Sequence, residues 1–115
     1  MSSGRSGHAS VGRSFYRLVR TDPPTVQDFL SHKERGVPLR NPAAREIYDG
    51  VSVQETIESA RRLAHNRKSS WFIAELAIPD DGTVAYRQTT NDPNHFTLWA
   101  TPDVLLACVV RTTLV

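Results

Sequence analysis

The segment Trp71-Phe72-Ile73-Ala74-Glu75-Leu76-Ala77-Ile78 (WFIAELAI) decides the fold class of this chain. It joins aromatic and β-branched residues with little polar alternation, which is typical of a strand covered on both faces. Pro79-Asp80-Asp81-Gly82 follows directly and predicts a turn, most simply the connection of a hairpin. We therefore expect residues 71–78 to form a buried strand of a sheet.

Three more strands are predicted between this segment and the C-terminus. Residues 83–89 follow the turn, and residues 95–100 (HFTLWA) form a short strand after a polar loop. After a second turn at 101–103, residues 104–114 are β-rich and apolar, so we expect one buried closing strand.

On the N-terminal side, one strand and two short helices are expected first. Residues 14–20 (SFYRLVR) alternate, with Phe15, Arg17 and Val19 on one face and Tyr16, Leu18 and Arg20 on the other. The helices are expected to begin at Thr25, with Asp28 in the first turn and Gly36 as the stop, and at Asn41-Pro42, with Gly50 as the stop.

A third helix is predicted to begin at Ser52, because Ser52-Val53-Gln54-Glu55 matches a capping box. Apolar residues then recur at helical spacing: Val53, Ile57, Ala60 and Ala64. Arg61, Arg62, Arg67 and Lys68 make the end of this helix basic, and a solvated helix end is favoured there over an anion-docking patch.

This order of one strand, three helices and four strands predicts an α+β fold with a mainly antiparallel sheet that is split or built in two parts. Residues 1–13 are rich in Gly and Ser without an apolar period, so we expect a disordered tail. Residues 14–115 are expected to form a single domain.

Charge and composition exclude some classes of function. Two of the 14 basic residues, Arg5 and Arg13, lie before residue 14, which leaves 12 basic against 12 acidic residues in the expected domain. A neutral domain gives no signal for nucleic-acid binding. The lone Cys108 and the scattered histidines give no metal-binding pattern, and no apolar stretch is as long as a membrane span. Without the apolar core of a signal peptide, a cytoplasmic location is expected.

Arg17 is the most informative candidate for a functional site. A guanidinium beside Phe15 and Val19 on one strand face needs a partner, because an unpaired buried charge is costly. Three interpretations remain open: an ion pair with Glu75, a position at the sheet edge, or a contact to an anionic ligand. Ser52 likewise has two compatible roles, a helix cap and a ligand contact at a helix start.

The order of elements resembles the ADP-ribosyltransferase-like fold in its compact bacterial forms. The matching motifs are the aromatic-Arg pair Tyr16-Arg17, the segment Gly50-Val51-Ser52, and the turn Thr101-Pro102-Asp103 before the closing strand. The chain also resembles small actinobacterial proteins with YRLV near the start and H-[FY]-T-L-W near the end. The resemblance covers residues 14–115.

This resemblance implies NAD as the cofactor, and an NAD-dependent transferase or NAD glycohydrolase as the activity. Arg17 would hold the diphosphate or the adjoining ribose, and Ser52 would support the nicotinamide ribose. Tyr16 or Trp99 would stack on nicotinamide, and His95 would bind a ribose hydroxyl.

The chain departs from this family at the acidic residue that the family uses in catalysis. Transferases of the Arg-Ser-Glu class use a late glutamate, and no glutamate follows Glu75. Gln88 or Asp92 would have to take its place, or the activity is lost. A different class of function is therefore also open: a small non-catalytic protein-interaction module of the accessory, immunity or regulatory kind. Its partner and its oligomeric state are not specified by the sequence.

Overall fold

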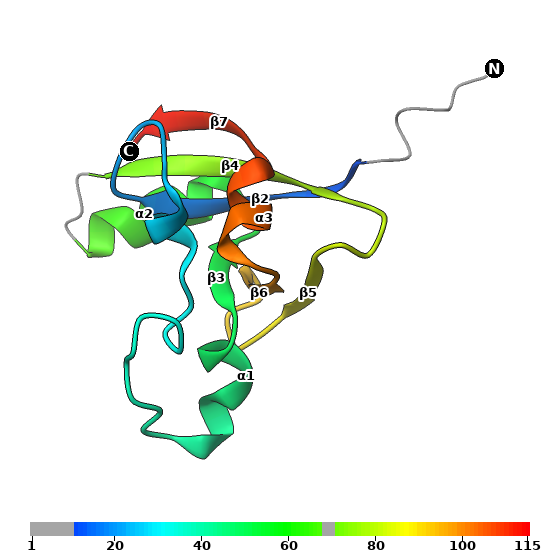
Figure 1. The fold of residues 1–115 in the computed structure, drawn as a ribbon. Coiled ribbons are helices and arrows are strands. Elements are labelled where there is room, and N and C mark those ends of the chain that lie inside the picture. Colours follow the sequence, from blue (N-terminus) through cyan, green and yellow to red (C-terminus); the bar gives the residue numbers. More distant parts are fainter. Residues whose placement is uncertain (1–10, 68–70) are drawn as a thin grey trace.

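The computed structural model describes residues 11–67 and 71–115 (Figure 1). The strands of this part of the chain are β2 (Val11–Val19), β3 (Val51–Gln54), β4 (Phe72–Pro79), β5 (Ala85–Gln88), β6 (His95–Trp99) and β7 (Val109–Leu114). They form a six-stranded sheet in the order β5-β6-β3-β2-β4-β7, and every pair in it is antiparallel. The expected α+β class with a mainly antiparallel sheet is confirmed.

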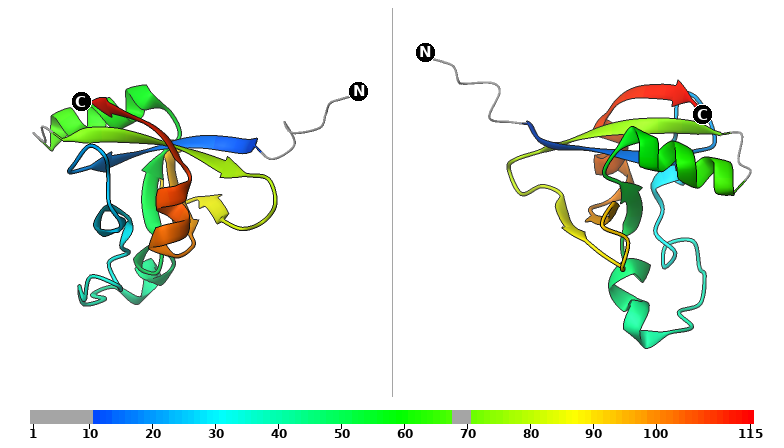
Figure 2. Two further views of the ribbon diagram at one scale, coloured as in Figure 1. Left: turned by 45° about the horizontal axis from the view of Figure 1, so that its top comes forward. Right: turned by 180° about the vertical axis from the view of Figure 1, so that it is seen from behind.

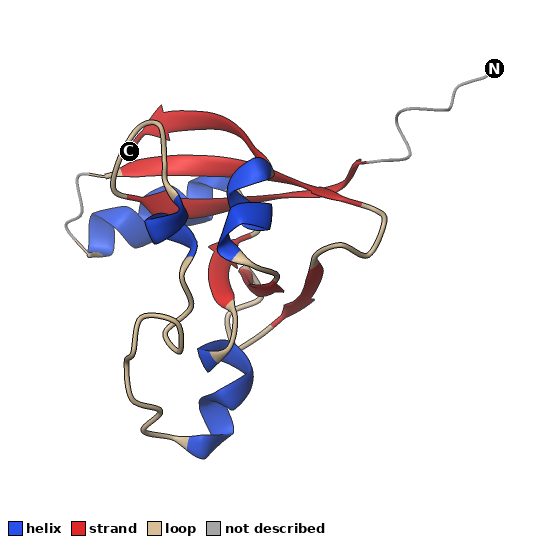
Figure 3. Ribbon diagram, viewed as in Figure 1, coloured by secondary structure: helices blue, strands red, loops and turns tan. Residues whose placement is uncertain are grey.

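The helical segments are short. They comprise the 3-10 helices η2 (Val26–Phe29) and η3 (Pro42–Ala44), and the α-helices α1 (Arg45–Tyr48), α2 (Ile57–Asn66) and α3 (Pro102–Ala107). α2 lies on one face of the sheet, and η2 and α3 lie together on the other (Figures 1, 2 and 3). The caps expected at Thr25 and Asn41 are confirmed, because each side chain accepts a hydrogen bond from a backbone N–H two residues later.

The sheet has two halves that meet at one short contact. β2, β4 and β7 make one half with long ladders, and β3, β6 and β5 make the other. Between them, β2 pairs with β3 only through Tyr16 and Gln54. In Figure 1, β2 and β4 run across the picture while β3 runs down it. The two strands therefore diverge beyond Tyr16, and a pocket lies at this divergence.

The main core lies between the sheet and the layer of η2 and α3. Phe15 of β2, Phe29 of η2, Leu98 of β6 and Leu105 of α3 are fully buried in it. On the other face, α2 buries small side chains such as Ala60, which lets the helix approach the sheet closely. Packing on both faces agrees with the buried strand expected at residues 71–78.

The helix expected to begin at Ser52 begins instead at Ile57, so the predicted capping box is wrong. Residues 51–54 form β3, in which Val53 is buried opposite Phe96 of β6. Thr56 is the N-cap of α2, and its hydroxyl accepts from the Ser59 N–H at 3.0 Å. Burial of β-branched residues in the sheet outweighs the local capping pattern.

The strand expected at 104–114 is wrong in its first half. Thr101, as N-cap, and Pro102, in the first turn, begin α3, which turns Leu105 into the core. Only residues 109–114 are extended, as β7. α3 therefore lies between the last two strands, and β3 lies between α1 and α2, so the helices do not all precede the strands. A short apolar run does not distinguish a buried helix from a buried strand.

The N-terminal boundary also differs from the expected one. β2 begins at Val11, and Arg13 pairs with Ile78 of β4 and forms an ion pair with Glu55. Residues 11–13, expected in the tail, thus belong to the sheet. Residues 1–10 of that tail lie outside the described residues.

Candidate functional site

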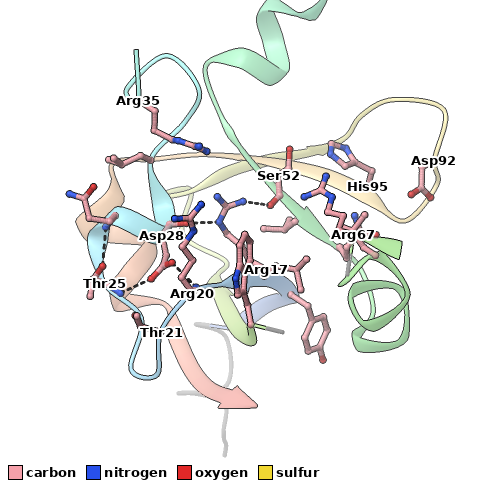
Figure 4. A pocket seen from close by; sticks show the side chains of 18 of the residues that line it. Arg17, Arg20, Thr21, Thr25, Asp28, Arg35, Ser52, Arg67, Asp92 and His95 are labelled. Atoms are coloured by element: carbon pink, nitrogen blue, oxygen red, sulfur yellow. Dashed lines mark hydrogen bonds between the residues drawn. The ribbon is translucent and has the colours of Figure 1, made fainter. Parts of the chain in front are cut away.

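A pocket of about 690 Å³ opens where β2 and β3 diverge (Figure 4). Its walls come from β2, β3, η2, the C-terminal end of α2, and the loop between β5 and β6. Volumes of this size are usual for small-molecule sites. The lining contains four of the residues that the sequence proposes for a site: Tyr16, Arg17, Ser52 and His95.

Arg17 joins the two sides of this pocket. Its Nε donates to the Asp28 carbonyl oxygen at 2.6 Å, and its Nη1 donates to the Ser52 carbonyl oxygen at 2.7 Å. Burial of the guanidinium lowers the pKa of Arg17 to about 10, an effect that the carboxylate of Asp28 opposes. Arg17 thus supplies donors where the ladder between β2 and β3 has ended.

The ion pair between Arg17 and Glu75 does not form. Glu75 of β4 pairs with Tyr16, one register position away from the partner of Arg17. The Glu75 carboxylate lies 3.8 Å from the guanidinium of Arg111 on β7. Because neighbouring residues of a strand point to opposite faces, Glu75 belongs with Tyr16 and not with Arg17. Burial is the main cause that raises the pKa of Tyr16, and Glu75 adds to it.

The 3-10 helix η2 forms one wall, and its geometry depends on Asp28. One carboxylate oxygen of Asp28 accepts from the Arg20 N–H at 2.9 Å, and the other accepts from the Thr25 N–H, also at 2.9 Å. Both oxygens are therefore engaged in holding η2 against the end of β2. The negative charge of Asp28 also acts on Arg17, whose pKa it raises against the effect of burial.

The loop between β5 and β6 forms the opposite wall, and His95 is the first residue of β6 after this loop. Thr89 is buried, and its hydroxyl lies 2.8 Å from His95 Nδ1 and 2.8 Å from the Thr97 hydroxyl. This fixes the imidazole ring and leaves Nε2 without a hydrogen-bond partner among the described residues. His95 can therefore offer Nε2 to a ligand in the pocket.

Gln88 and Trp99 are not brought to the pocket. The Gln88 side-chain amide donates to the carbonyl oxygens of Thr89, Thr90 and Asp92 at 2.9–3.1 Å, so it shapes the loop. Trp99 lies at the opposite end of β6 from His95, where its Nε1 donates to the Glu46 carbonyl at 3.1 Å. Of the residues that Gln88 contacts, Thr90 and Asp92 line the pocket.

Three arginines of the pocket were not proposed from the sequence as a site: Arg20, Arg35 and Arg67. With Arg17 they place four guanidinium groups in the lining, against the two carboxylates of Asp28 and Asp92. Only Arg67 carried a signal, as part of a basic helix end that was interpreted as solvated. Lys68 of that group lies outside the described residues. The convergence itself depends on tertiary structure, because the arginines come from three separate segments.

Two classes of feature are missing from the described residues. No group of three His, Cys, Asp or Glu side chains in residues 11–67 and 71–115 is arranged to hold a metal ion. None of the helices in these ranges is long and apolar enough to cross a membrane. Cys108 is buried, and this burial raises the pKa of its thiol.

Comparisons of the chain with protein-family models, with curated proteins and with solved structures gave no match.

Proposed function

We propose that this chain is an NAD-binding domain of the ADP-ribosyltransferase-like kind and that NAD occupies the pocket between β2 and β3. One observation carries the proposal. Tyr16, Arg17, Ser52 and His95, which the resemblance assigns to NAD, come from three strands and line the same pocket, whose arginines outnumber its carboxylates. An excess of arginine in a pocket favours a phosphorylated ligand.

The proposed contacts with NAD are assigned to polar atoms of the pocket that make no hydrogen bond within the described residues. The Ser52 carbonyl is used by Arg17, which leaves the Ser52 hydroxyl for the nicotinamide ribose. His95 Nε2 serves a ribose hydroxyl. Tyr16 contributes to the lining, but its side chain lies on the face of β2 opposite to Arg17, so it is given no stacking role in the proposal. The stacking role that the sequence offered to Trp99 is dropped from the proposal, because Trp99 does not line the pocket.

In the catalytic form of this proposal, Asp92 and not Gln88 supplies the carboxylate. Cleavage of the N-glycosidic bond develops positive charge on the ribose, which a carboxylate stabilises. Asp92 Oδ1 accepts from the Asn94 N–H at 2.9 Å, and Oδ2 has no hydrogen bond to another described residue. Release of nicotinamide from NAD by the native chain and its loss in Asp92→Asn would support the catalytic form. No release by the native chain would leave NAD binding alone.

Calorimetric titration with NAD tests the binding. We expect saturation at millimolar NAD or below, and weaker binding by Ser52→Asp, because this change adds a negative charge beside the diphosphate. Asn41→Asp is the matched control: it adds the same charge outside the pocket and keeps a good helix cap. No heat of binding at millimolar NAD, with the fold intact, would contradict the proposal.

A second candidate function, a non-catalytic interaction module, is favoured by a different observation. β7 is an edge strand, and Val110 and Leu114 on it are 60 % and 65 % exposed. An exposed apolar edge can pair with the same strand of a second copy. Neither Trp71 nor Trp99 is among the exposed large apolar residues of the described chain, so these two residues add no support to this candidate.

Sedimentation equilibrium tests the interaction module. A dimer that Val110→Lys converts to a monomer would support it, because a lysine on an edge strand opposes pairing. A monomeric native chain at high micromolar concentration would contradict it.

A further inference from the structure

The four arginines of the pocket differ in how many of their donors are already used. Arg17 donates through Nε and Nη1 to two protein carbonyls, so two of its five N–H groups are already used. Arg20, Arg35 and Arg67 have neither an ion pair nor a side-chain hydrogen bond to another described residue. These three arginines therefore have more free donors for a ligand than Arg17 has.

Arg35 and Arg67 approach Arg17 from opposite sides of the pocket. Arg35 belongs to the turn after η2, and Arg67 follows the C-terminal end of α2 (Figure 4). Both arginines line the same pocket as Arg17, and their positive charges help to lower its pKa. Like charges that converge favour an anion, and the four arginines of the lining exceed its two carboxylates by two charges.

Arg20 is placed differently from this pair. Its guanidinium carbon lies 4.9 Å from the centre of the Trp71 ring, so it is held by a cation–π contact at the rim. Its backbone N–H is bound by Asp28. Arg35 and Arg67 are thus the two cations of the lining that are held neither by a carbonyl nor by an aromatic ring.

We propose that Arg35 and Arg67 form a diphosphate subsite, in which each guanidinium binds the oxygens of one phosphate. The lining has four arginines and two aspartates, and a diphosphate bridge with one charge on each phosphate balances that excess. Planar guanidinium groups bind phosphate through two parallel hydrogen bonds. Arg17 instead ties η2 to β3 and shapes the subsite. The inference rests on the proposed function in assigning this diphosphate to a dinucleotide.

Titration with inorganic pyrophosphate and, separately, with NAD tests the subsite. We expect Arg35→Gln and Arg67→Gln each to weaken the binding of both probes about tenfold, the effect of one lost charge-assisted contact. Arg61→Gln is the matched control, since Arg61 is an exposed arginine of α2 outside the pocket, and it should leave both affinities unchanged. Melting curves verify that each variant is folded.

The outcomes separate the subsite from the proposed function. If both probes bind and neither glutamine variant weakens their binding, the subsite is overturned and NAD binding stays in place. The same conclusion follows if NAD binds and pyrophosphate does not. Binding of pyrophosphate that depends on Arg35 and Arg67, without binding of NAD, would support the subsite and overturn the NAD assignment. Binding of neither probe would overturn both.

Discussion

At the scale of single residues, the Arg17 guanidinium makes hydrogen bonds where the pairing between β2 and β3 has ended. Beyond Tyr16 and Gln54 the backbones of β2 and β3 no longer pair. Arg17 reaches across this gap and donates to the Ser52 carbonyl and, on its other side, to the Asp28 carbonyl. The charge that looked like a ligand contact in the sequence is therefore also a structural link.

We predict that Arg17→Met destabilises the domain by about 2 kcal/mol. The change removes the donors of two carbonyl groups and leaves them unsatisfied. Urea denaturation measures the difference, with Arg61→Met on the exposed surface of α2 as the control. A loss no greater than that of the control would show that water satisfies both carbonyls.

Gln88 allows a second prediction at this scale. Its side-chain N–H groups donate to three carbonyl oxygens, so Gln88→Ala should cost about 1 kcal/mol. Gln88→Glu should cost more, because its carboxylate would face those oxygens without a proton to donate. Thermal melting of both variants gives the order, and a glutamate variant as stable as the native chain would contradict it.

At the scale of elements, Thr56 and not Ser52 begins the central helix. We predict that Thr56→Ala lowers stability by about 1 kcal/mol, because the Ser59 N–H loses its acceptor. Ser52→Ala should cost less, since the contact of Ser52 with Arg17 uses the backbone carbonyl. Denaturant midpoints of the two variants test the order, and equal losses would argue against it.

The connection between β4 and β5 gives a pH-dependent prediction. Hydrogen bonds from the Thr83 hydroxyl and N–H hold the pKa of Asp81 below its ordinary value of about 3.9. A carboxyl whose pKa is lowered by folding stabilises the folded state when the pH is above its ordinary, unfolded-state pKa. This contribution is lost as the pH falls through the folded-state pKa. The excess stability of the native chain over Asp81→Asn should therefore shrink in acid.

Melting temperatures of both proteins between pH 7 and pH 2 measure this difference. A gap that stays constant with pH would mean that the charge of Asp81 has no part in the turn.

At the scale of the whole molecule, Arg13 joins the two halves of the sheet. It belongs to β2, forms an ion pair with Glu55 just after β3, and lies over the rings of Phe15 and Phe96 at 5.0 and 4.8 Å. Residues 11–13, which the sequence placed in a disordered tail, therefore contribute to the stability of the sheet. We predict that a chain starting at Ser14 melts several degrees lower, as expected for about 1 kcal/mol of lost contacts.

A chain that starts at Val11 keeps these contacts and is the matched control. Equal melting temperatures for the two truncated chains would refute the role given to Arg13.

Local patterns were sufficient for much of the secondary structure and for part of the site. The alternation in SFYRLVR put Phe15 and Val19 on one face, and both are buried in the core. The caps at Thr25 and Asn41 could be predicted because each side chain binds the backbone only two residues further along the chain. The family resemblance also pointed to Arg17, Ser52 and His95, which share one pocket.

The sequence by itself determined the α+β class and the first two helix starts, because these depend on interactions between residues close in the chain. Only the tertiary structure decided that residues 51–54 are a strand, since their stabilising partners are on β6. It likewise decided that Arg17, Arg35 and Arg67 meet at one pocket. Such choices depend on burial and charge contributed by distant segments, which local spacing does not encode.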